Sequence, residues 1–218
     1  MSRPDYPILA REGRAHLILV SVAVVVATWL WGWGSIPVWL LAAFVFQFFR
    51  DPARNITTDR RAIVCPASGK VVSLEQEENP YQDGERMVKV SIFMNVFSVH
   101  SNLIPVSGTV EKTDYFAGSF LNAALDKASL ENERNAIWIR TEEGHDVHSV
   151  QIAGLIARRI FSYVKEGDTV ETGQRYGFIR FGSRVDIYLP LNSRIEVKLG
   201  QWVSSGTNIL AYLPENKG

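Results

Sequence analysis

Two apolar runs near the N-terminus constrain the fold more than any other feature of this 218-residue chain. Residues 16–31 and 36–49 are almost free of charged side chains, and the tetrapeptide GWGS at 32–35 separates them. A helix rises 1.5 Å per residue, so each run forms a helix of roughly 22 Å, against about 30 Å for the hydrocarbon core of a bilayer. The pattern predicts a transmembrane helical hairpin that either spans the bilayer with the help of flanking aromatic residues or inserts only partly.

Aromatic and basic residues around these runs indicate an orientation. The tryptophans near the turn are typical of an interfacial belt, and they are Trp29, Trp31, Trp33 and Trp39. Basic residues flank both ends of the hairpin: Arg3, Arg11 and Arg14 before it, and Arg50, Arg54, Arg60 and Arg61 after it. The positive-inside rule then places both ends in the cytoplasm, so we expect a protein of the inner cell membrane whose globular part faces the cytoplasm. A cleaved signal peptide fits less well, because no small-x-small site precedes a polar region and a second apolar run follows.

The charge balance and the single cysteine narrow the class of the remaining part. With 23 basic and 23 acidic side chains the chain has no formal net charge, which argues against a nucleic-acid-binding protein. Cys65 is the only cysteine, so an internal disulfide is excluded and a buried free thiol is the simplest interpretation. The length fits one compact domain with an appendage, which we place at residues 51–218 and 1–50.

Short alternating runs from residue 63 onward predict mainly β structure. Examples are MVKVSI at 87–92 and RVDIYL at 184–189. Two internal repeats organise this region: PASGKV at 66–71 recurs as PVSGTV at 105–110, and KxGxxVxxG at 165–173 recurs at 198–206. Paired hairpins of this kind resemble the barrel-sandwich hybrid of lipoyl and biotinyl carriers. The expected fold is therefore a barrel-sandwich-hybrid-like β domain with short helices, preceded by the helical hairpin.

The dipeptide Gly182-Ser183 lies between two β-like segments and carries a specific chemical possibility. The Ser183 hydroxyl can attack the preceding amide carbonyl, giving an ester by an N-to-O acyl shift. Elimination and hydrolysis then leave a pyruvoyl group at a new N-terminus. Taken alone, a glycine and a serine between strands are better explained by a turn or a bulge.

Several separated motifs accompany this dipeptide. They are FGSR at 181–184, FMNVFSVHSN at 93–102, PVSG at 105–108, FLNA at 120–123 and ENERN at 131–135. Together, and in this order, they resemble the short, membrane-anchored phosphatidylserine decarboxylase family over residues 49–213. The resemblance implies a pyruvoyl-dependent carboxy-lyase that forms phosphatidylethanolamine and CO2 from a phospholipid at the membrane.

The family's mechanism implies roles for particular residues. A precursor would cleave itself between Gly182 and Ser183 into a β chain of residues 1–182 and an α chain of residues 183–218, which stay together as a heterodimer or a higher oligomer. The cofactor is the pyruvoyl group made from Ser183, which forms a Schiff base with the substrate amine. His100 matches the histidine of the family's processing triad, and a histidine with its ordinary pKa near 6.5 suits a general base at neutral pH.

Two other histidines have a different interpretation. His145 and His148 lie in the polar run EEGHDVH at 142–148, and a third ligand at a recognisable spacing is missing. A solvated hairpin is therefore favoured over a metal site, and we expect no metal.

The chain departs from the family at position 68. The family has an aspartate in the motif PADG, whereas this chain reads PASG, so that Ser68 occupies the place of the triad acid. A neutral serine cannot hold a catalytic histidine in one tautomer or stabilise its cation, and the loss of such an acid costs a hydrolytic triad about 10⁴ in rate. Self-maturation is therefore in doubt. Three explanations of Ser68 are open. Another acid, such as Glu131 or Glu133, serves as the triad acid; the serine is a deliberate substitution that traps the uncleaved precursor; or the lineage has lost activity.

Substrate contacts follow mainly from the need for a lipid amine to reach Ser183 while the acyl chains stay in the bilayer. Candidate head-group and substrate contacts are Asn95, Phe97, Tyr115 and Asn122. An apolar lip beside the site is one interpretation of Met94, Val96, Phe97 and Phe116, but apolar side chains at such spacing more often belong to the core, which is the favoured interpretation.

The alternative function is a membrane-tethered carrier or adaptor without chemistry. The tripeptide DKA at 126–128 reproduces the surroundings of a lipoylated lysine. However, Lys127 precedes the first glycine-rich hairpin, whereas a lipoyl lysine follows it closely. A solvated lysine is the favoured interpretation.

Overall fold

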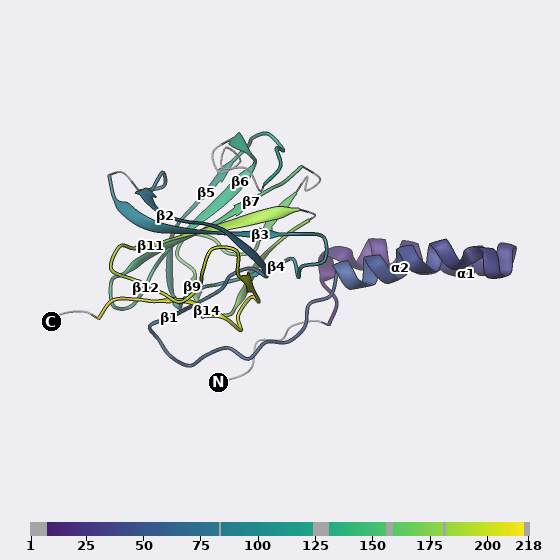
Figure 1. The fold of residues 1–218 in the computed structure, drawn as a ribbon, viewed down its shortest axis with the longest axis horizontal. Helices are drawn as coiled ribbons and strands as arrows, with labels where there is room; N and C mark the ends of the chain where they lie inside the picture. Colours follow the sequence, from purple (N-terminus) through teal and green to yellow (C-terminus); the bar gives the residue numbers. More distant parts are fainter. Residues whose placement is uncertain (1–7, 83, 124–130, 156–158, 181, 216–218) are drawn as a thin grey trace. The chain divides into compact units, whose positions relative to one another are not determined.

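The computed structural model describes residues 8–82, 84–123, 131–155, 159–180 and 182–215. The chain divides into two compact units at the junction of Ala53 and Arg54. The unit before this junction holds the helical hairpin, and the unit after it holds the strands of the described residues (Figure 1). The helix α1 (Arg14–Trp31) follows a short 3-10 helix, η1 (Arg11–Gly13), and a second 3-10 helix, η2 (Gly32–Ser35), connects α1 to α2 (Ile36–Phe48).

Small and branched apolar residues pack the two helices against each other. In α1 the buried residues recur at intervals of three and four, and they are Leu17, Val20, Val24 and Ala27. Val20 and Val24 pack with Ala42 of α2. This spacing forms one stripe along a helix, which is the geometry that an antiparallel helix pair requires. The predicted hairpin is confirmed.

Polar groups at the turn of the hairpin are satisfied within the hairpin itself. Gly32 has a φ of 51°, a left-handed conformation that glycine adopts without strain. The Ser35 hydroxyl donates a 2.7 Å hydrogen bond to the Gly32 carbonyl, and the Trp39 indole N–H donates to Thr28 Oγ1 at 3.1 Å. In an apolar environment such internal bonds replace those that water would otherwise make.

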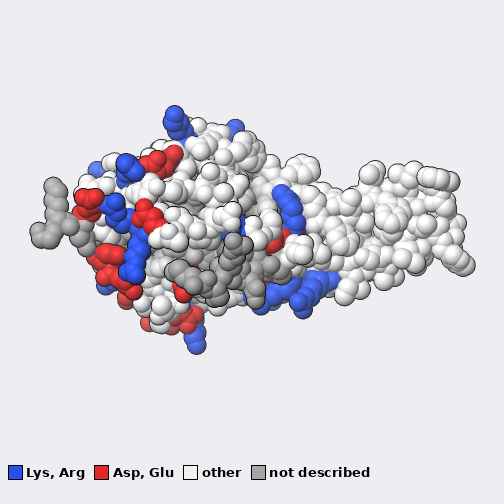
Figure 2. Space-filling model, turned by 90° about the horizontal axis from the view of Figure 1, so that it is seen from below, with Lys and Arg blue, Asp and Glu red and all other residues white. Residues whose placement is uncertain are grey.

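The hairpin has the length and composition of a membrane-spanning segment. Within Arg11–Phe48 the most apolar 18-residue window has a mean hydropathy of 2.0, and only 22% of it is buried. In the view of Figure 2, charged side chains are almost absent from the helices, whereas side chains of both charges occur on the visible face of the strand-containing unit. The exposed apolar surface distinguishes this hairpin from the core helix of a water-soluble domain, which is mostly buried.

The second unit is built from short antiparallel strands. They are β1 (Ala62–Val64), β2 (Gly69–Glu78), β3 (Arg86–Met94), β4 (Ser101–Leu103), β5 (Gly108–Phe116), β6 (Arg134–Arg140), β7 (Asp146–Ile152), β8 (Ile160–Ser162), β9 (Thr169–Val170), β10 (Arg175–Ile179), β11 (Ser183–Pro190), β12 (Arg194–Ile195), β13 (Trp202–Val203) and β14 (Ile209–Tyr212). Among the described residues they form an eight-stranded sheet in the order β13-β2-β3-β11-β7-β6-β5-β9 and two three-stranded sheets, β1-β14-β12 and β4-β10-β8. The expectation of a mainly β fold with an N-terminal helical hairpin is confirmed.

Strand β11 lies inside the large sheet, between β3 and β7 (Figure 1). Its residues Val185, Ile187 and Leu189 belong to the main apolar core. The intervening residues lie on the opposite face of the sheet, where Tyr188 packs with Met87 of β3. Strand β11 is covered on both faces and paired on both edges, and its first residue, Ser183, pairs with Met94 of β3 at the end of this central strand.

The two sequence repeats are repeats of structure. Gly69 begins β2 and pairs with Val203 of β13, while Gly108 begins β5 and pairs with Val170 of β9. The glycines of the second repeat bond back to the first in the same way. Gly200 N–H donates to the Val71 carbonyl and Gly167 N–H donates to the Val110 carbonyl, both at 2.8 Å. The last glycine of each KxGxxVxxG run also makes an equivalent bond. Gly206 N–H donates to the Cys65 carbonyl and Gly173 N–H donates to the Ile104 carbonyl, both at 2.8 Å.

Candidate functional site

Ser183 is the first residue of β11 and is completely buried. It pairs with Met94, the last residue of β3, and directly opposed residues of an antiparallel pair share one face of the sheet. Because Met94 belongs to the main core, the serine side chain faces the interior. Its Oγ has no hydrogen-bond partner among the described residues. Leaving a buried hydroxyl unpaired costs about 1–3 kcal/mol, so stability alone gives no reason for a serine here.

The residue before it has the backbone conformation of a sharp turn. Gly182 has a φ of 62°, and a Cβ at this position would meet nothing within 4 Å. The glycine is therefore required by its conformation and not by a lack of space. The Gly182-Ser183 peptide lies where a left-handed turn changes directly into an extended strand.

The segment that carries His100 runs beside the segment that carries Ser183. Residues 95–100 connect β3 to β4, and residues 180–182 connect β10 to β11. The two connections are held together at both ends, by the Met94–Ser183 pair and by a 3.3 Å hydrogen bond from Ile179 N–H to the His100 carbonyl. His100 is completely buried, and its ring lies 6.3 Å from that of Phe178. The fold thus brings together the two stretches that the sequence separates by more than 80 positions.

A chain of buried amides lies on the same side of the sheet and was not anticipated from the sequence. Asn135 Nδ2 donates to Gln151 Oε1 at 3.2 Å, and Gln151 Nε2 donates to Asn102 Oδ1 at 2.9 Å. Asn102 Nδ2 lies 3.8 Å from the sulfur of Met94, which pairs with Ser183. These hydrogen bonds fix the side chains around the start of β11 and keep the polar interior ordered.

Ser68 lies one residue before β2 and binds another serine. Its Oγ is 3.0 Å from Ser205 Oγ and accepts the Ser205 backbone N–H at 2.9 Å. The same segment reaches β4, since Leu103 N–H donates to the Pro66 carbonyl at 2.9 Å. Position 68 therefore belongs to the surroundings of the strand that follows His100, and its polar atoms are already engaged.

The two alternative acids have different environments. Glu131 is exposed, and its carbonyl accepts the Ser119 N–H at 2.7 Å. Glu133 is buried and binds the phenol of Tyr115, whose pKa is raised by desolvation and by this carboxylate. Because Glu133 already binds the Tyr115 phenol, it is a weaker candidate for the role of the triad acid.

The predicted substrate contacts are spread over several environments. Asn95 Oδ1 accepts the Phe97 N–H at 2.9 Å and the Ser98 hydroxyl at 3.3 Å, so its side chain shapes the connection that leads to His100. Phe97, Tyr115 and Asn122 are exposed. The exposed ring of Phe97, in the connection that carries His100, suits contact with an apolar ligand. Asn95 instead stabilises the conformation of this connection.

The core interpretation, which the sequence favoured over an apolar lip, is confirmed for Met94. Met94 is fully buried in the main core because its side chain faces inward from β3. Phe116 lies 5.9 Å from Tyr81 and under the guanidinium of Arg134 at 4.2 Å, so these neighbours cover it. Val96 is partly exposed and Phe97 is 64% exposed, which leaves these two as apolar surface on the connection itself. Lys127, the candidate carrier lysine, lies outside the described residues.

A buried ion pair follows Ser183 directly and was also missed by the sequence reasoning. Arg184 Nε lies 2.8 Å from Asp186 Oδ1, and a second guanidinium nitrogen donates to Asp186 Oδ2 at 3.0 Å. Another donates to the Ala123 carbonyl at 3.2 Å. Both charged side chains are almost completely buried. Paired in two places and bonded to the backbone, Arg184 anchors the chain directly after the Gly182–Ser183 peptide.

The remaining polar candidates lie apart from this site. Among the described residues no group of three or more His, Cys, Asp or Glu side chains is placed to hold a metal. His148 is fully buried, stacks on Trp138 with ring centroids 5.5 Å apart and lies 3.0 Å from Gln82 Oε1. The interpretation as a solvated hairpin is therefore wrong for His148. Cys65 is buried as expected, and burial raises its pKa to about 12.

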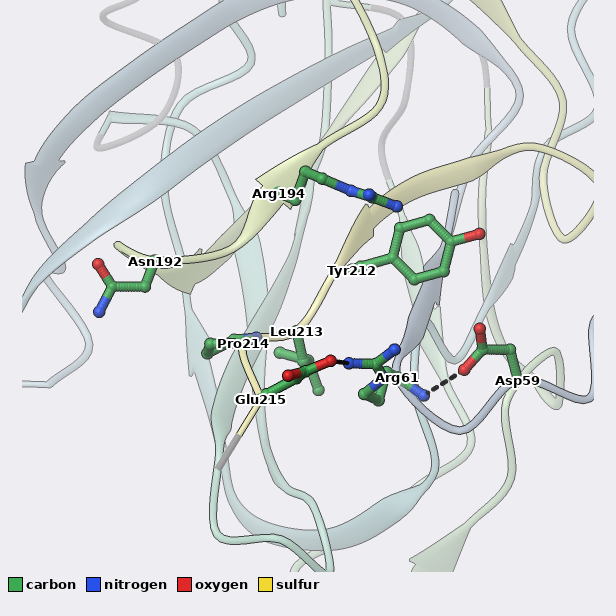
Figure 3. A pocket seen from close by; sticks show the side chains of 8 residues that line it. All are labelled: Asp59, Arg61, Asn192, Arg194, Tyr212, Leu213, Pro214 and Glu215. Atoms are coloured by element: carbon green, nitrogen blue, oxygen red, sulfur yellow. Dashed lines mark hydrogen bonds and ion pairs between the residues drawn. The ribbon is translucent and has the colours of Figure 1, made fainter. Parts of the chain in front are cut away.

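One surface pocket of about 360 Å³ lies against the β1-β14-β12 sheet (Figure 3). Arg61 binds two of the other lining residues, because its guanidinium donates to Glu215 at 2.7 Å and its backbone N–H donates to Asp59 Oδ1 at 2.9 Å. The other lining residues are Asn192, Arg194, Tyr212, Leu213 and Pro214. None of the predicted site residues lines this pocket.

Comparison with known proteins gives a consistent result. The family model described as phosphatidylserine decarboxylase matches residues 41–211. The chain is 55% identical over 211 residues to the phosphatidylserine decarboxylase proenzyme of Burkholderia pseudomallei, covering 96% of this chain and 97% of the relative. It is also 55% identical over 209 residues to the proenzyme of that name from Ralstonia nicotianae, covering 95% and 97% of the two chains. A Burkholderia cenocepacia proenzyme is 53% identical over 211 residues, with 96% and 98% covered.

Proposed function

Because the chain belongs to the phosphatidylserine decarboxylase family, we propose that it is the precursor of an enzyme that converts phosphatidylserine to phosphatidylethanolamine and CO2. The precursor cleaves its own backbone between Gly182 and Ser183 and thereby makes a pyruvoyl group at residue 183. One observation carries this assignment. Ser183 is a fully buried serine whose hydroxyl has no partner among the described residues, and it directly follows a glycine in a left-handed turn.

The self-cleavage requires only groups of the chain and one water molecule. The Ser183 hydroxyl attacks the Gly182 carbonyl carbon; a C–O bond forms, the C–N bond breaks, and the hydroxyl proton moves to the released amine. Loss of the Ser183 Cα proton then breaks the Cβ–O bond and frees the Gly182 carboxylate. The remaining enamine becomes an imine, to which water adds and from which ammonia leaves. His100 is proposed as the base that takes the hydroxyl proton, since its segment is held against that of Ser183.

Position 183 fits a pyruvoyl group on this structure. A pyruvoyl carbonyl, when present, supplies an electrophile for the substrate amine and withdraws electrons as CO2 leaves. Ser183 is fully buried opposite Met94, and Asn102 and Gln151, on the same side of the sheet, are fixed by their hydrogen bonds. A fixed polar environment strengthens electrostatic effects on the reacting atoms.

The two products of cleavage are expected to remain one folded unit. Residues 183–218 include β11, which pairs with β3 along its whole length and with β7 over five residues. They also include β14, which pairs with β1 of the larger fragment. The proposed β chain, 1–182, and α chain, 183–218, therefore share the large sheet and the core after scission.

The hairpin supports a membrane location for the proposed enzyme. We assign residues 1–50 as the anchor and residues 51–218 as the catalytic part, with Arg residues at both ends of the hairpin favouring a cytoplasmic catalytic part at the inner membrane. Exposed Phe97 on the His100 connection is a suitable contact for the acyl region of a lipid. No observation on the described residues favours the carrier alternative, which predicts an intact chain.

The intact mass of the purified protein under denaturing conditions tests the proposal. Scission yields a fragment of 36 residues, 183–218, with an N-terminus that is blocked to sequential degradation. CO2 release from phosphatidylserine in mixed micelles gives the second readout. Ser183→Ala should abolish both, whereas Ser107→Ala, at an exposed turn, should change neither. An intact chain in both the natural sequence and Ser68→Asp overturns the proposal.

A further inference from the structure

We propose that Gly154 is a positioning residue for self-cleavage: the space left by its missing side chain receives the Gly182 carbonyl and fixes that group for attack by Ser183. This inference rests on the proposed function. It adds a residue that neither the sequence motifs nor the comparisons single out.

The contact between the two glycines is very close. A Cβ added to Gly154 would lie 1.6 Å from the carbonyl oxygen of Gly182 and 2.8 Å from its carbonyl carbon. Real Cβ atoms do not approach backbone this closely, so a side chain at 154 forces the carbonyl to move. The φ of Gly154 is outside the left-handed range, so its conformation is open to any residue. Glycine is needed here for space alone.

The position of Gly154 in the sheet explains the contact. The ladder between β7 and β11 ends at the pair Ile152–Arg184. Two residues further along each antiparallel strand lie Gly154 and Gly182. The scissile carbonyl therefore packs on the backbone that continues β7, where a hydrogen of Gly154 points to the carbonyl oxygen in the manner of a weak Cα–H···O contact.

A buried asparagine holds the Gly154 segment in place. Asn132 is fully buried, and its Nδ2 donates to the Ala153 carbonyl at 2.7 Å and to the Leu121 carbonyl at 2.8 Å. Its Oδ1 accepts the Leu121 N–H at 2.8 Å. The Ala153 N–H in turn donates to the Glu133 carbonyl at 2.9 Å. The surface on which the Gly182 carbonyl rests is thus fixed by hydrogen bonds on both sides of Ala153.

The other side of the scissile bond is anchored to the same group of segments. Arg184 donates to the Ala123 carbonyl, and the Cβ of Ala123 is 3.3 Å from the position of the missing Gly154 Cβ. Gly182 and Arg184, the two neighbours of Ser183, therefore each contact this group. Fixing both ends limits the positions that the Ser183 Oγ and the Gly182 carbonyl carbon can take relative to each other.

The acyl shift depends on that relative position. An intramolecular attack gains its rate from reacting atoms held close and aligned, and a misplacement of about 1 Å can cost about 100-fold. The obstacle to a methyl group at 154 is backbone, which cannot rotate away as a flexible side chain does. Gly154→Ala must therefore shift the reacting carbonyl.

The test compares Gly154→Ala with Gly108→Ala, a matched change elsewhere in the sheet. A Cβ at Gly108 would lie 2.2 Å from the Arg140 carbonyl oxygen, so this variant meets the same kind of backbone obstacle away from the scissile bond. Both variants are made as the full chain, in the natural sequence and with Ser68→Asp, and followed by intact mass and thermal unfolding. Gly154→Ala is expected to slow scission about 100-fold, and Gly108→Ala to leave it unchanged.

Hydroxylamine separates a positional effect from a general loss of structure. It cleaves the ester formed by the acyl shift, so it releases fragments wherever the shift has occurred. A folded Gly154→Ala chain that stays intact in hydroxylamine supports the inference, because the shift itself is then blocked. Scission at the parental rate, or an equal loss in Gly108→Ala, overturns it.

Asn132→Ala carries the test if Gly154→Ala does not fold. Removal of this side chain releases the Ala153 carbonyl without introducing a clash, so scission should slow. An unchanged rate of scission overturns the inference. The two failures are distinguishable. If the parent chain stays intact both with Ser68 and with Ser68→Asp, the proposed function itself is contradicted. If the parent chain cleaves and Gly154→Ala cleaves at the same rate, only the inference about Gly154 is contradicted.

Discussion

The hydroxyl oxygens of Ser68 and Ser205 lie 3.0 Å apart, and the Ser68 oxygen also accepts the Ser205 backbone N–H at 2.9 Å. The same arrangement occurs in the other repeat. There Ser107 Oγ is 3.0 Å from Thr172 Oγ1, and it accepts the Thr172 backbone N–H at 2.9 Å. Ser68 thus makes the same kind of structural contact as Ser107 makes in the other repeat, where no chemistry is proposed.

Replacing Ser68 by aspartate should accelerate scission of the precursor. A carboxylate at 68 can accept the Ser205 N–H and hydroxyl that the serine oxygen contacts now, so the change fits the local hydrogen bonds. A triad acid contributes up to about 10⁴ in rate, and we expect an acceleration of at least about 100-fold. The appearance of the 36-residue fragment with time, followed by mass, measures it.

The repeat supplies the control for this prediction. Ser107→Asp makes the same chemical change in the same local geometry, and it should leave the rate of scission unaltered. Equal rates for Ser68→Asp and the natural chain contradict the idea that the serine limits maturation.

Replacing His100 by glutamine should slow scission by about 100-fold or more, the contribution of a general base. Glutamine keeps hydrogen-bonding atoms on a side chain of similar reach but cannot take up the hydroxyl proton. His145→Gln is the matched change in the β6–β7 turn and should cleave at the parental rate. Time courses of the intact mass for the two variants decide the matter, and a His100→Gln chain that matures normally rules His100 out as the base.

The buried histidine of β7 should make the fold less stable in mild acid. Burial lowers the pKa of His148 from its ordinary value of 6.5 to about 4. Between these two values the unfolded chain binds a proton that the folded chain does not, so the free energy of unfolding falls as the pH is lowered from about 6.5 to 4. The full shift corresponds to about 3 kcal/mol.

Denaturant unfolding of the full chain at pH 7 and pH 4.5 measures this effect. His148→Phe retains an aromatic ring for stacking on Trp138 and has no proton to bind, so its stability should fall less over the same pH interval. An identical pH dependence in both proteins contradicts the assignment of the effect to His148.

The sequence predicted those features that depend on local pattern. The spacing of the glycines in the two repeats predicted paired hairpins, and the apolar runs predicted α1 and α2. Such features are specified by neighbouring residues along the chain. The Gly182-Ser183 dipeptide was recognisable for the same reason. Features that depend on distant segments were not visible. Gly154 has no local signal, since the need for a glycine arises only where the Gly182 carbonyl packs on it.

Burial on both faces of the sheet explains the error at His148. Strand β7 carries His148 and Gln151 on faces that are both covered, so the alternation that separates inside from outside is absent. The sequence therefore carries no sign that His148 is buried, and its polar neighbours led to the interpretation as a solvated hairpin. Met94 is buried, as the favoured core interpretation predicted, because β3 remains paired with β11 to its last residue.

The exposed apolar surface of the hairpin should hold the protein in the membrane. Val25 in α1 and Leu40 in α2 are each 68% exposed within the structure. A lysine at the centre of a membrane segment costs about 2.5–3.5 kcal/mol, so Val25→Lys with Leu40→Lys should shift the protein from the carbonate-resistant membrane pellet toward the soluble fraction. Leu199→Lys places the same charge at a side chain that is 67% exposed on the strand-containing unit, and it should leave the protein in the pellet. Scission should proceed in both variants because β3, β7 and β11 are unchanged. Full retention of the double variant in the pellet contradicts the assignment of the hairpin as the anchor.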